Sequence, residues 1–454
     1  MTTSLPKTPP SLWRVYLMFL GPMILSNILQ GLSGTLNGIF IGQMLGTHAL
    51  ASVAGMFPIV FFFISLVIGL GAGASVLVGQ AWGAREPGKV RAITGAALAL
   101  GALIGLVAAV LGSLFAREAM VALGTPADVL EDALRFARVM MLMMPVLLVF
   151  ILFTQLLRGV SDTISPLLAL LMSTTVGLVL TPAFIQGWLG LPRLGILSAA
   201  VASLLSTMAA MVFLAVRLRR LGHVMAPDRK LLAAFRLDRT ILAKVLKIGL
   251  PTGVQMVIIS LSELVILALV NQHGSQATAA YGAVTQVVNY VQFPALSIAI
   301  TASILAAQAI GSGATERLDA ILKTGLWLNV AITGSFVLLG YALSHALLGL
   351  FLTDTAVLRQ GEHLLHIMLW SLLLFGFQAV VGGIMRASGD VLVPTAITIF
   401  CILVVQMGVA WALNRRLGLE GIWIGFPVAY LAMLVLQTTY FRGIWRHKPI
   451  RRLV

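Results

Sequence analysis

Apolar stretches of about twenty residues or more recur along the whole chain, separated by short polar segments. A helix needs about 20 apolar residues to cross the hydrocarbon core of a bilayer. Hydrophobic residues make up 59% of the chain, charged residues only 10%, and the mean hydropathy is +1.02. A water-soluble protein of this length needs a more charged surface. The sequence therefore predicts an all-α polytopic membrane protein without a sizeable soluble domain.

Gly, Pro and charged residues divide the apolar sequence into twelve predicted transmembrane helices. Their positions, with each end known to about four residues, are 13–41, 49–81, 90–115, 129–157, 163–187, 195–220, 240–271, 276–309, 318–347, 358–386, 393–414 and 420–444. The longest polar gap, at about 221–239, separates six helices from six. We therefore expect an N-terminal six-helix bundle over 1–225, a cytoplasmic linker over 226–239 and a C-terminal six-helix bundle over 240–454.

The net charge of +15 is concentrated in the gaps between the apolar runs. With the N-terminus placed in the cytoplasm, all but seven of the 30 Lys and Arg residues fall on the cytoplasmic side, as the positive-inside rule predicts. This distribution predicts a multi-pass inner (plasma) membrane protein with both termini in the cytoplasm. Nucleic-acid binding is not expected, because the basic residues are not interleaved with aromatic residues on one folded face.

Short sequence motifs recur at a separation of 228 residues, so the two halves are predicted to be repeats. The segment LVGQAWG corresponds to LAAQAIG, and LRGVSDTISP corresponds to MRASGDVLVP. In the second pair three residue types coincide: Arg158, Asp162 and Pro166 with Arg386, Asp390 and Pro394. Within each motif the Arg is expected to pair with the Asp and to latch the adjoining helices. Six helices per half make the repeats parallel, and two like bundles around a central cleft favour alternating access.

Polar side chains follow one face of several predicted helices, although such positions are costly against lipid. Those of the first helix are Asn27, Gln30, Ser33 and Asn37. Those of the eighth helix are Gln286, Asn289, Tyr290, Ser297 and Thr301. The seventh and tenth helices add Gln255, Ser260 and Gln378. These residues are predicted to line a wet substrate cleft, and the alternative is that they form hydrogen bonds between helices.

Glu263 lies in the middle of an apolar run, GVQMVIISLSELVILALV, whereas the other fourteen acids lie in loops or near predicted helix ends. A carboxyl group titrates near pH 4.3 in water, and burial away from countercharge makes its charged form costly. Such a group can exchange a proton near physiological pH as its exposure changes, which is what a proton-coupled transporter needs. The alternatives are a permanently protonated hydrogen-bond donor and a carboxylate paired with an arginine of another helix.

These segments resemble the multidrug and toxin extrusion (MATE) family, and the resemblance covers almost the whole chain. The opening GPMILSNILQGLSGTLNGIFIGQMLG is similar to the first helix of that family, LVGQAWGAREPGKVRA to the exit from its second, and LLRGVSDTISP to the join of its fourth and fifth. GLPTGVQ and LAAQAIGSG repeat these marks in the second half. The resemblance implies two six-helix bundles forming a V-shaped cleft, and export of organic cations coupled to inward flow of protons or sodium.

Several positions depart from the family pattern. Asn37 stands where many members have an aspartate, and Thr181 replaces the acid of the fifth-helix LDP motif. Phe375 stands where the sodium-associated branch has an acid on the tenth helix. That branch also has a glutamate about one turn nearer the seventh-helix proline than Glu263, on roughly the same face. The resemblance therefore implies coupling through the second bundle, and favours protons over sodium.

The sequence as a whole predicts a secondary antiporter that exports small organic, cationic and drug-like molecules in exchange for protons, with Glu263 as the cation-coupling residue. The alternatives are sodium coupling and a flippase for lipid-linked saccharides. A flippase is expected to need a cationic cavity for pyrophosphate, and the first half has no Lys or Arg in the middle of a predicted helix. The expected partners are the lipid bilayer, small organic substrates and protons, with sodium as the alternative ion, and the protein is expected to be a monomer.

Enzymatic chemistry is not expected from this sequence. It shows no paired carboxylates, metal-spaced histidines or Ser–His arrangement, and of the histidines only His363 and His366 are closely spaced on a helix. We therefore expect no metal and no cofactor. The single cysteine, Cys401, lies in an apolar run and is expected to be inert packing. The N-terminal segment has no cleavage site, so the first apolar stretch is expected to be retained as a helix.

Overall fold

The structure, a computed structural model, describes residues 11–46, 49, 53, 56–122 and 130–454. Helices are the only regular elements in these ranges. Twelve helical stretches in this part of the chain are long and apolar enough to cross a bilayer, which confirms the predicted all-α polytopic fold. Most predicted ends agree with the structure to within about four residues. The second helix is predicted to begin at residue 49, and most of the next six residues lie outside the described ranges.

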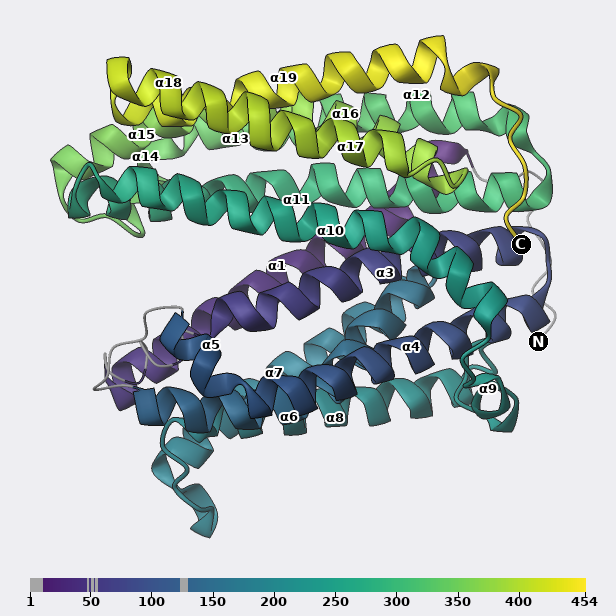
Figure 1. Ribbon diagram of the computed structural model, residues 1–454, viewed down its shortest axis with the longest axis horizontal. Coiled ribbons are helices and arrows are strands. Elements are labelled where there is room, and N and C mark those ends of the chain that lie inside the picture. Colours follow the sequence, from purple (N-terminus) through teal and green to yellow (C-terminus); the bar gives the residue numbers. More distant parts are fainter. Residues whose placement is uncertain (1–10, 47–48, 50–52, 54–55, 123–129) are drawn as a thin grey trace. The chain divides into compact units, whose positions relative to one another are not determined.

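Figure 1 colours the helices in chain order. Those up to the linker are α1 (Leu12–Leu45), α3 (Phe57–Gly83), α4 (Pro87–Leu114), α5 (Ala116–Ala122), α6 (Leu130–Gly159), α7 (Ile164–Gln186), η1 (Trp188–Gly190), α8 (Leu197–Arg220) and α9 (Arg229–Ala234). Those that follow are α10 (Arg239–Asn271), α11 (Ser275–Ser312), η2 (Thr315–Arg317), α12 (Leu318–Leu328), η3 (Asn329–Thr333), α13 (Gly334–Ala342), α14 (Ser344–Gly349), α15 (Thr355–Leu369), α16 (Ser371–Ala387), α17 (Leu392–Phe400), η4 (Cys401–Gln406), α18 (Met407–Leu417), α19 (Leu419–Gly443) and η5 (Trp445–His447).

Two spans of the second half contain a π-helical segment, η3 in the ninth and η4 in the eleventh. In η3 the buried Asn329 donates a hydrogen bond from Nδ2 to the carbonyl of Leu373 on α16, at 3.1 Å. Its carboxamide occupies the space that a side chain at Gly376 would fill. The wider turn thus coincides with a polar side chain that bonds another helix.

The helices form two compact units, which do not coincide with the predicted bundles. The N-terminal unit comprises Leu25–Val254, and the C-terminal unit comprises Gln255–Val454 together with the chain up to Ile24. The predicted bundles assign α1 and α10 whole to one half each. In the structure each of these helices contributes its first part to one unit and its remainder to the other.

The first part of α10 packs in the N-terminal unit through glycines. A side chain at Gly69 of α3 would overlap the backbone of Gly253, and one at Gly73 would lie 2.6 Å from the backbone nitrogen of Gly249. The helices therefore meet backbone to backbone, which only residues without a Cβ atom permit. This contact fixes the start of the helix that carries Glu263.

The first part of α1 packs in the C-terminal unit through a tyrosine. Tyr16 is fully buried and donates a hydrogen bond from its hydroxyl to the carbonyl of Ile321 on α12, at 2.9 Å. A Cβ atom at Gly325 would lie 3.1 Å from that hydroxyl. The glycine thus leaves room for the phenol, whose polar end is satisfied inside the unit.

Left-handed backbone positions support the predicted duplication. Four pairs of residues with positive φ are separated by 228: Gly46 and Gly274, Arg85 and Gly313, Ser161 and Gly389, Gly190 and Gly418. Positive φ is unfavourable for residues with a Cβ atom, so glycine is the usual choice there. The two halves therefore share the backbone turns that end helices, although the residue types at these turns differ.

The predicted Arg–Asp latches are wrong. Arg158 donates to the side chain of Gln155 at 3.2 Å, and Asp162 instead lies 3.8 Å from Nε2 of His223 in the segment after α8. Asp162 also accepts a hydrogen bond from the backbone of Ser165 at 2.9 Å. Burial lowers the pKa of His223, and the nearby Asp162 opposes that effect only in part. The histidine side chain is 18% exposed, and Nδ1 accepts a hydrogen bond from the backbone of Met225 at 3.1 Å.

In the C-terminal unit the corresponding aspartate, Asp390 between α16 and α17, pairs with a lysine, which is charged at neutral pH. Lys448 donates to Asp390 at 2.8 Å and to the hydroxyl of Tyr440 at 2.6 Å. Tyr440 in turn donates to Asp390 at 2.7 Å. The hydrogen bond to Asp390, followed by the one to Tyr440, raises the pKa of Lys448 above its usual value. In both units, then, a residue after a long helix pairs with the aspartate of the Arg–Asp motif. His223 after α8 pairs with Asp162, and Lys448 after α19 pairs with Asp390.

Candidate functional site

Glu263 lies in the second part of α10, which belongs to the C-terminal unit. About one turn away on either side, Ile259 and Ile266 contact apolar clusters of this unit. Because residues three or four apart share a helix face, Glu263 stands on the packed face of α10. Its own side chain is nevertheless exposed. The carboxyl therefore lies at the open edge of a packed face rather than inside the core.

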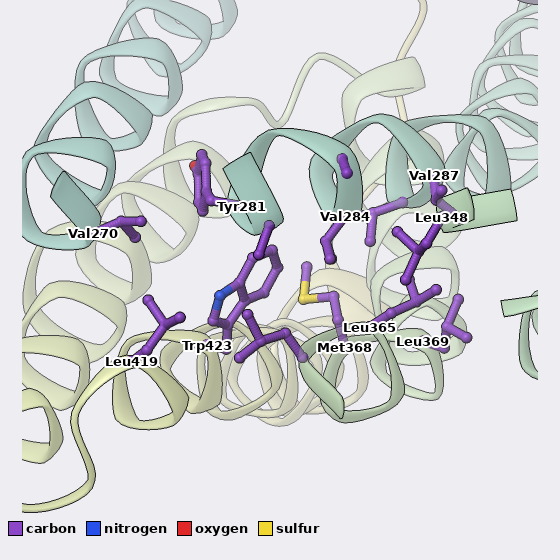
Figure 2. Packing of buried hydrophobic residues seen from close by; sticks show 14 of the residues in the cluster. Val270, Tyr281, Val284, Val287, Leu348, Leu365, Met368, Leu369, Leu419 and Trp423 are labelled. Atoms are coloured by element: carbon purple, nitrogen blue, oxygen red, sulfur yellow. The ribbon is translucent and has the colours of Figure 1, made fainter. Parts of the chain in front are cut away.

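Two tyrosines from other helices lie close to Glu263. Tyr281 comes from α11 and Tyr430 from α19, and the charge of Glu263 acts on both hydroxyl groups. The ring of Tyr281 packs against that of Trp423, with 5.4 Å between the ring centroids (Figure 2). The ring of Tyr430 packs against Phe375 at 5.3 Å. Two phenols, each packed against another aromatic ring, therefore lie within reach of the charge of this carboxyl.

Both tyrosines near Glu263 pack in or against one apolar cluster of the C-terminal unit. Figure 2 shows Trp423 of α19 and Tyr281 of α11 among aliphatic side chains of α15 and α11. Trp423 is 2% exposed and Tyr281 is 8% exposed. Large, well-packed rings have few alternative rotamers, so the fold fixes the position of Tyr281 and of the Trp423 ring that it contacts.

Glu263 has no cationic neighbour in the described ranges. Its carboxylate takes part in none of the ion pairs closer than 4.0 Å among those residues. A carboxylate at membrane depth without a countercharge is costly, and either a proton or a bound cation removes that cost. The expected alternative of an arginine partner from another helix is thus not what the structure has. What the site can do chemically is to bind and release a single positive charge.

Phe375 contributes a ring to this site where the resemblance places an acid in the sodium-associated branch. Its contact with Tyr430 fills the position with apolar surface. Within the part of the chain that the structure describes, no group of three or more His, Cys, Asp or Glu residues is arranged to hold a metal ion. The site as described therefore offers one carboxylate and two phenol oxygens.

The predicted polar stripe of α11 divides into two parts. Gln286 and Asn289 are exposed and Tyr290 is half-buried, so the first part presents polar groups at the surface of the unit. Ser297 and Thr301 are fully buried, and each hydroxyl donates to the carbonyl four residues earlier, at 2.9 and 2.8 Å. The second part therefore has its hydroxyls bonded within its own helix.

The remaining predicted residues of the C-terminal unit are less exposed. Gln255 and Ser260 of α10 are half-buried, and the hydroxyl of Ser260 donates to the carbonyl of Met256 at 3.0 Å. Gln378 of α16 is 7% exposed. These three residues add polarity to helices that otherwise carry aliphatic side chains, which is costly unless each group finds a partner.

In the N-terminal unit the structure brings together the two positions at which this chain departs from the family pattern. The hydroxyl of Thr181 on α7 donates to Oδ1 of Asn37 on α1, at 3.4 Å. Thr181 is 1% exposed and Asn37 is half-buried. Of the other predicted residues on α1, Asn27 and Ser33 are half-buried and Gln30 is exposed. A neutral pair therefore occupies this place, with no group that titrates near neutral pH.

Sequence reasoning missed the two tyrosines that lie near Glu263. Each is a single phenol in an apolar stretch, AAYGAV for Tyr281 and VAYLAM for Tyr430. A phenol at membrane depth needs a partner for its hydroxyl, and that requirement was the available signal. The sequence does not show which helices are neighbours, so it could not join them to Glu263.

Comparison with known families agrees with the duplicated architecture. The sequence profile of the MatE family matches residues 22–183 and 251–412. The two matched segments are equally long, and they begin at Pro22 and Pro251, the prolines inside α1 and α10. The profile thus matches once in each half.

Known proteins of similar sequence and structure cover nearly the whole chain. The probable multidrug resistance protein YoeA of Bacillus subtilis is 40% identical over 450 residues, covering 99% of this chain and 97% of the relative. The multidrug export protein MepA of Staphylococcus aureus is 23% identical over 412 residues, covering 90% of this chain and 89% of that one. The crystal structure of a mutant of the Vibrio cholerae MATE transporter VcmN superposes with a TM-score of 0.88 at 18% identity, covering 97% and 98% of the chains. This last likeness shows a common fold.

Proposed function

Because this chain belongs to the MatE transporter family, we propose that it is a secondary antiporter that exports small organic, cationic molecules in exchange for protons. The names of the relatives support this proposal, since one of them, a probable multidrug resistance protein, is 40% identical over nearly the whole chain. The distribution of basic residues supports a place in the inner membrane with both termini in the cytoplasm. The twelve candidate spans among the described residues support this topology, because an even number of crossings leaves both ends on one side.

The observation that carries the coupling role is the unpaired carboxyl of Glu263 at the open edge of the C-terminal unit. When protonated, this group is neutral and tolerates an apolar surrounding. When deprotonated, it attracts a cation, and the neighbouring rings of Tyr281 and Tyr430 suit an organic one. One carboxylate cannot hold both charges, so occupancy by a proton and by a cationic substrate exclude each other. That exclusion is the condition for exchange.

Protons fit this site better than sodium. Hard metal cations are held by about six oxygen ligands, often including more than one carboxylate. The surroundings of Glu263 supply two phenol oxygens and aromatic rings, and Phe375 contributes no oxygen. A proton needs only the carboxylate itself. Sodium coupling is the alternative, and a transport measurement separates the two.

The pH gradient supplies the energy for this exchange. Exchange of one proton for one monovalent cation moves no net charge, so the membrane potential does not drive it. A pH difference of one unit is a tenfold difference in proton concentration, worth about 1.4 kcal/mol. A single titrating carboxyl can therefore support about a tenfold outward accumulation of the substrate for each unit of pH difference.

Among the predicted cleft residues, we propose Gln30, Gln286 and Asn289 as substrate contacts, because their side chains are exposed. We propose Ser297 and Thr301 as structural residues, because their hydroxyls already bond the backbone of α11. Substrate contacts are expected to change KM when replaced, whereas structural residues are expected to change the amount of folded protein.

The test is efflux from vesicles that contain the full-length protein, driven by an imposed pH gradient or an imposed sodium gradient, with ethidium as the transported cation. We expect Glu263→Gln to reduce pH-driven efflux at least tenfold, because glutamine is polar but cannot take up a proton. Glu420→Gln is the matched control, since Glu420 is a half-exposed acid of the same unit that pairs with His363. Undiminished pH-driven efflux by Glu263→Gln would remove this residue from the mechanism, and efflux driven only by sodium would replace the proposed ion.

A further inference from the structure

The linker between α8 and α10, residues Leu221–Arg239, packs against the helices of the N-terminal unit. Leu231 of α9 is 5% exposed, and the backbone of Ala234 lies so close to Gly95 on α4 that a side chain there would overlap it. The backbone is held as well, because Arg91 donates to the carbonyl of Val224 at 2.9 Å. One side of the linker is therefore fixed against the membrane-spanning helices.

The two acids of the linker are already engaged in holding its shape. Asp228 accepts hydrogen bonds from the backbone nitrogens of Lys230 and Leu231, at 3.0 and 2.8 Å, and lies 3.6 Å from Arg91. The bond from Leu231 is the main reason why the pKa of Asp228 is below its ordinary value. Asp238 accepts in the same way at the start of α10. Both acids therefore cap helices.

The other side of the linker combines exposed apolar and exposed basic side chains. The apolar ones are Leu221 at 59%, Leu232 at 65%, Phe235 at 45% and Leu237 at 50% exposure. The basic ones, in the linker or directly before it, are Arg220, Arg229, Lys230, Arg236 and Arg239, all exposed. None of these five forms an ion pair with an acid of the residues that the structure describes. All four apolar side chains lie outside the twelve spans.

We propose that the linker is an interfacial anchor that binds anionic lipid headgroups. An element with apolar side chains on one side and Lys and Arg around them lies in the plane of the membrane surface. There the apolar groups enter the boundary between headgroups and acyl chains, and each nearby basic residue is attracted to anionic lipid. The linker joins α8 and α10 directly, so it lies where a span ends, within reach of that boundary. The charge complementarity selects anionic over zwitterionic lipid.

The depth of the linker is measured with a spin label on the full-length protein in phosphatidylcholine vesicles with and without phosphatidylglycerol. The label is attached at Phe235→Cys in a chain that carries Cys401→Ser. A second label at Gln272→Cys, an exposed position in the turn between α10 and α11 and outside the twelve spans, serves as the aqueous control. We expect the label at 235 to be relaxed by oxygen more than by a water-soluble nickel chelate, and more so when phosphatidylglycerol is present. A label equally accessible to the chelate at both positions would overturn the proposal.

The attraction between the basic residues of the linker and anionic lipid is measured by the enrichment of phosphatidylglycerol around the reconstituted protein. We expect Arg229→Gln, Lys230→Gln and Arg236→Gln together to lower that enrichment about fivefold or more. The control variant has the same loss of charge elsewhere, at Arg117, Arg415 and Arg416. Equal losses in both variants would mean unspecific attraction and would overturn the proposal. So would a label at 235 that both relaxing agents fail to reach, which would indicate a protein partner, or displacement of the lipid by equimolar inorganic phosphate.

Discussion

In the N-terminal unit, the hydroxyl of Thr181 bonds Asn37, and neither residue can carry a charge near neutral pH. In the C-terminal unit, Glu263 stands without a countercharge beside Tyr281 and Tyr430. The two units share their backbone turns at an offset of 228 residues. The comparison teaches that the two copies share a scaffold, while the acid without a countercharge lies in the C-terminal unit. Coupling to an ion is therefore proposed for one half of the molecule.

The first parts of α1 and α10 each belong to the unit opposite to the rest of their helix. The two crossings are alike in this respect, but different contacts hold them. The first part of α10 is held by glycines that meet backbone to backbone, and the first part of α1 is held by Tyr16 and its bond to Ile321. The glycine contact leaves no room for any side chain. The tyrosine contact depends on one hydrogen bond and on the space above Gly325. Substitutions should therefore be tolerated less in the crossing of α10 than in that of α1.

The largest effect is expected at Gly69, where Val would overlap the backbone of Gly253. Backbone atoms of two packed helices cannot move apart locally, so we expect Gly69→Val to destabilise the protein by about 3 kcal/mol or more. The measurement is the amount of monodisperse protein and its thermal midpoint in detergent. Gly34→Val is the control, because nothing lies within 4 Å of a Cβ atom there. Equal loss in both variants would contradict the close contact of α3 and α10.

A smaller effect, dependent on pH, is expected at the join of the N-terminal unit. Burial holds the pKa of His223 below its ordinary value, so the folded protein favours the neutral ring. Stability is therefore fully present above pH 6.5 and is lost as pH falls through the lowered pKa. Protonation at Nδ1 would end the hydrogen bond from Met225, which is worth about 1 kcal/mol.

The thermal midpoint of the wild type should accordingly fall between pH 7.5 and 5.5 by more than that of His223→Asn, whose side chain keeps an acceptor but does not titrate. The join of the C-terminal unit supplies the contrast. Lys448 has a raised pKa, so its contribution is constant below pH 10.5 and is lost only as pH rises through the raised value. Identical pH profiles of wild type and His223→Asn would show that this ring takes no part.

The smallest effects are expected at the paired turns Arg85 and Gly313, which share a positive φ. Gly313→Ala forces a Cβ atom into this conformation and should cost about 1 kcal/mol. Arg85→Gly removes the same strain and should stabilise the protein by about 0.5 kcal/mol. Both shifts are read as thermal midpoints, with Gly282→Ala on an open face of α11 as the reference for an unstrained glycine. Shifts of the same sign in both variants would argue against equivalent turns.

The spans were predictable because an apolar run of sufficient length has one stable state in a bilayer, a helix. The π-helical turn η3 was not, since it coincides with a bond from Asn329 to Leu373, a residue 44 positions away. Glu263 was recognisable from the sequence as an isolated acid in an apolar run. Its neighbours Tyr281 and Tyr430 were not, because they come from helices whose proximity no local pattern encodes.

The polar stripe of α11 shows a second limit of pattern reading. Asn289 and Thr301 lie on one face by their spacing, yet the first is exposed and the second is buried with its hydroxyl bonded to its own helix. A periodicity gives the face of a helix but not the depth at which neighbouring helices cover it. The Arg–Asp latches failed for a similar reason, since the segments after α8 and α19 supply the partners of both aspartates.

The partner of Tyr16 is the carbonyl of Ile321, which follows it by 305 residues. A ribosome that adds about 5–20 residues per second needs roughly 15–60 s to make that stretch. Throughout this interval Tyr16 lacks the carbonyl that its hydroxyl bonds in the finished protein, and its phenol must be tolerated by lipid or by an insertion factor. Completion of the C-terminal unit thus requires a segment made early to join one made much later.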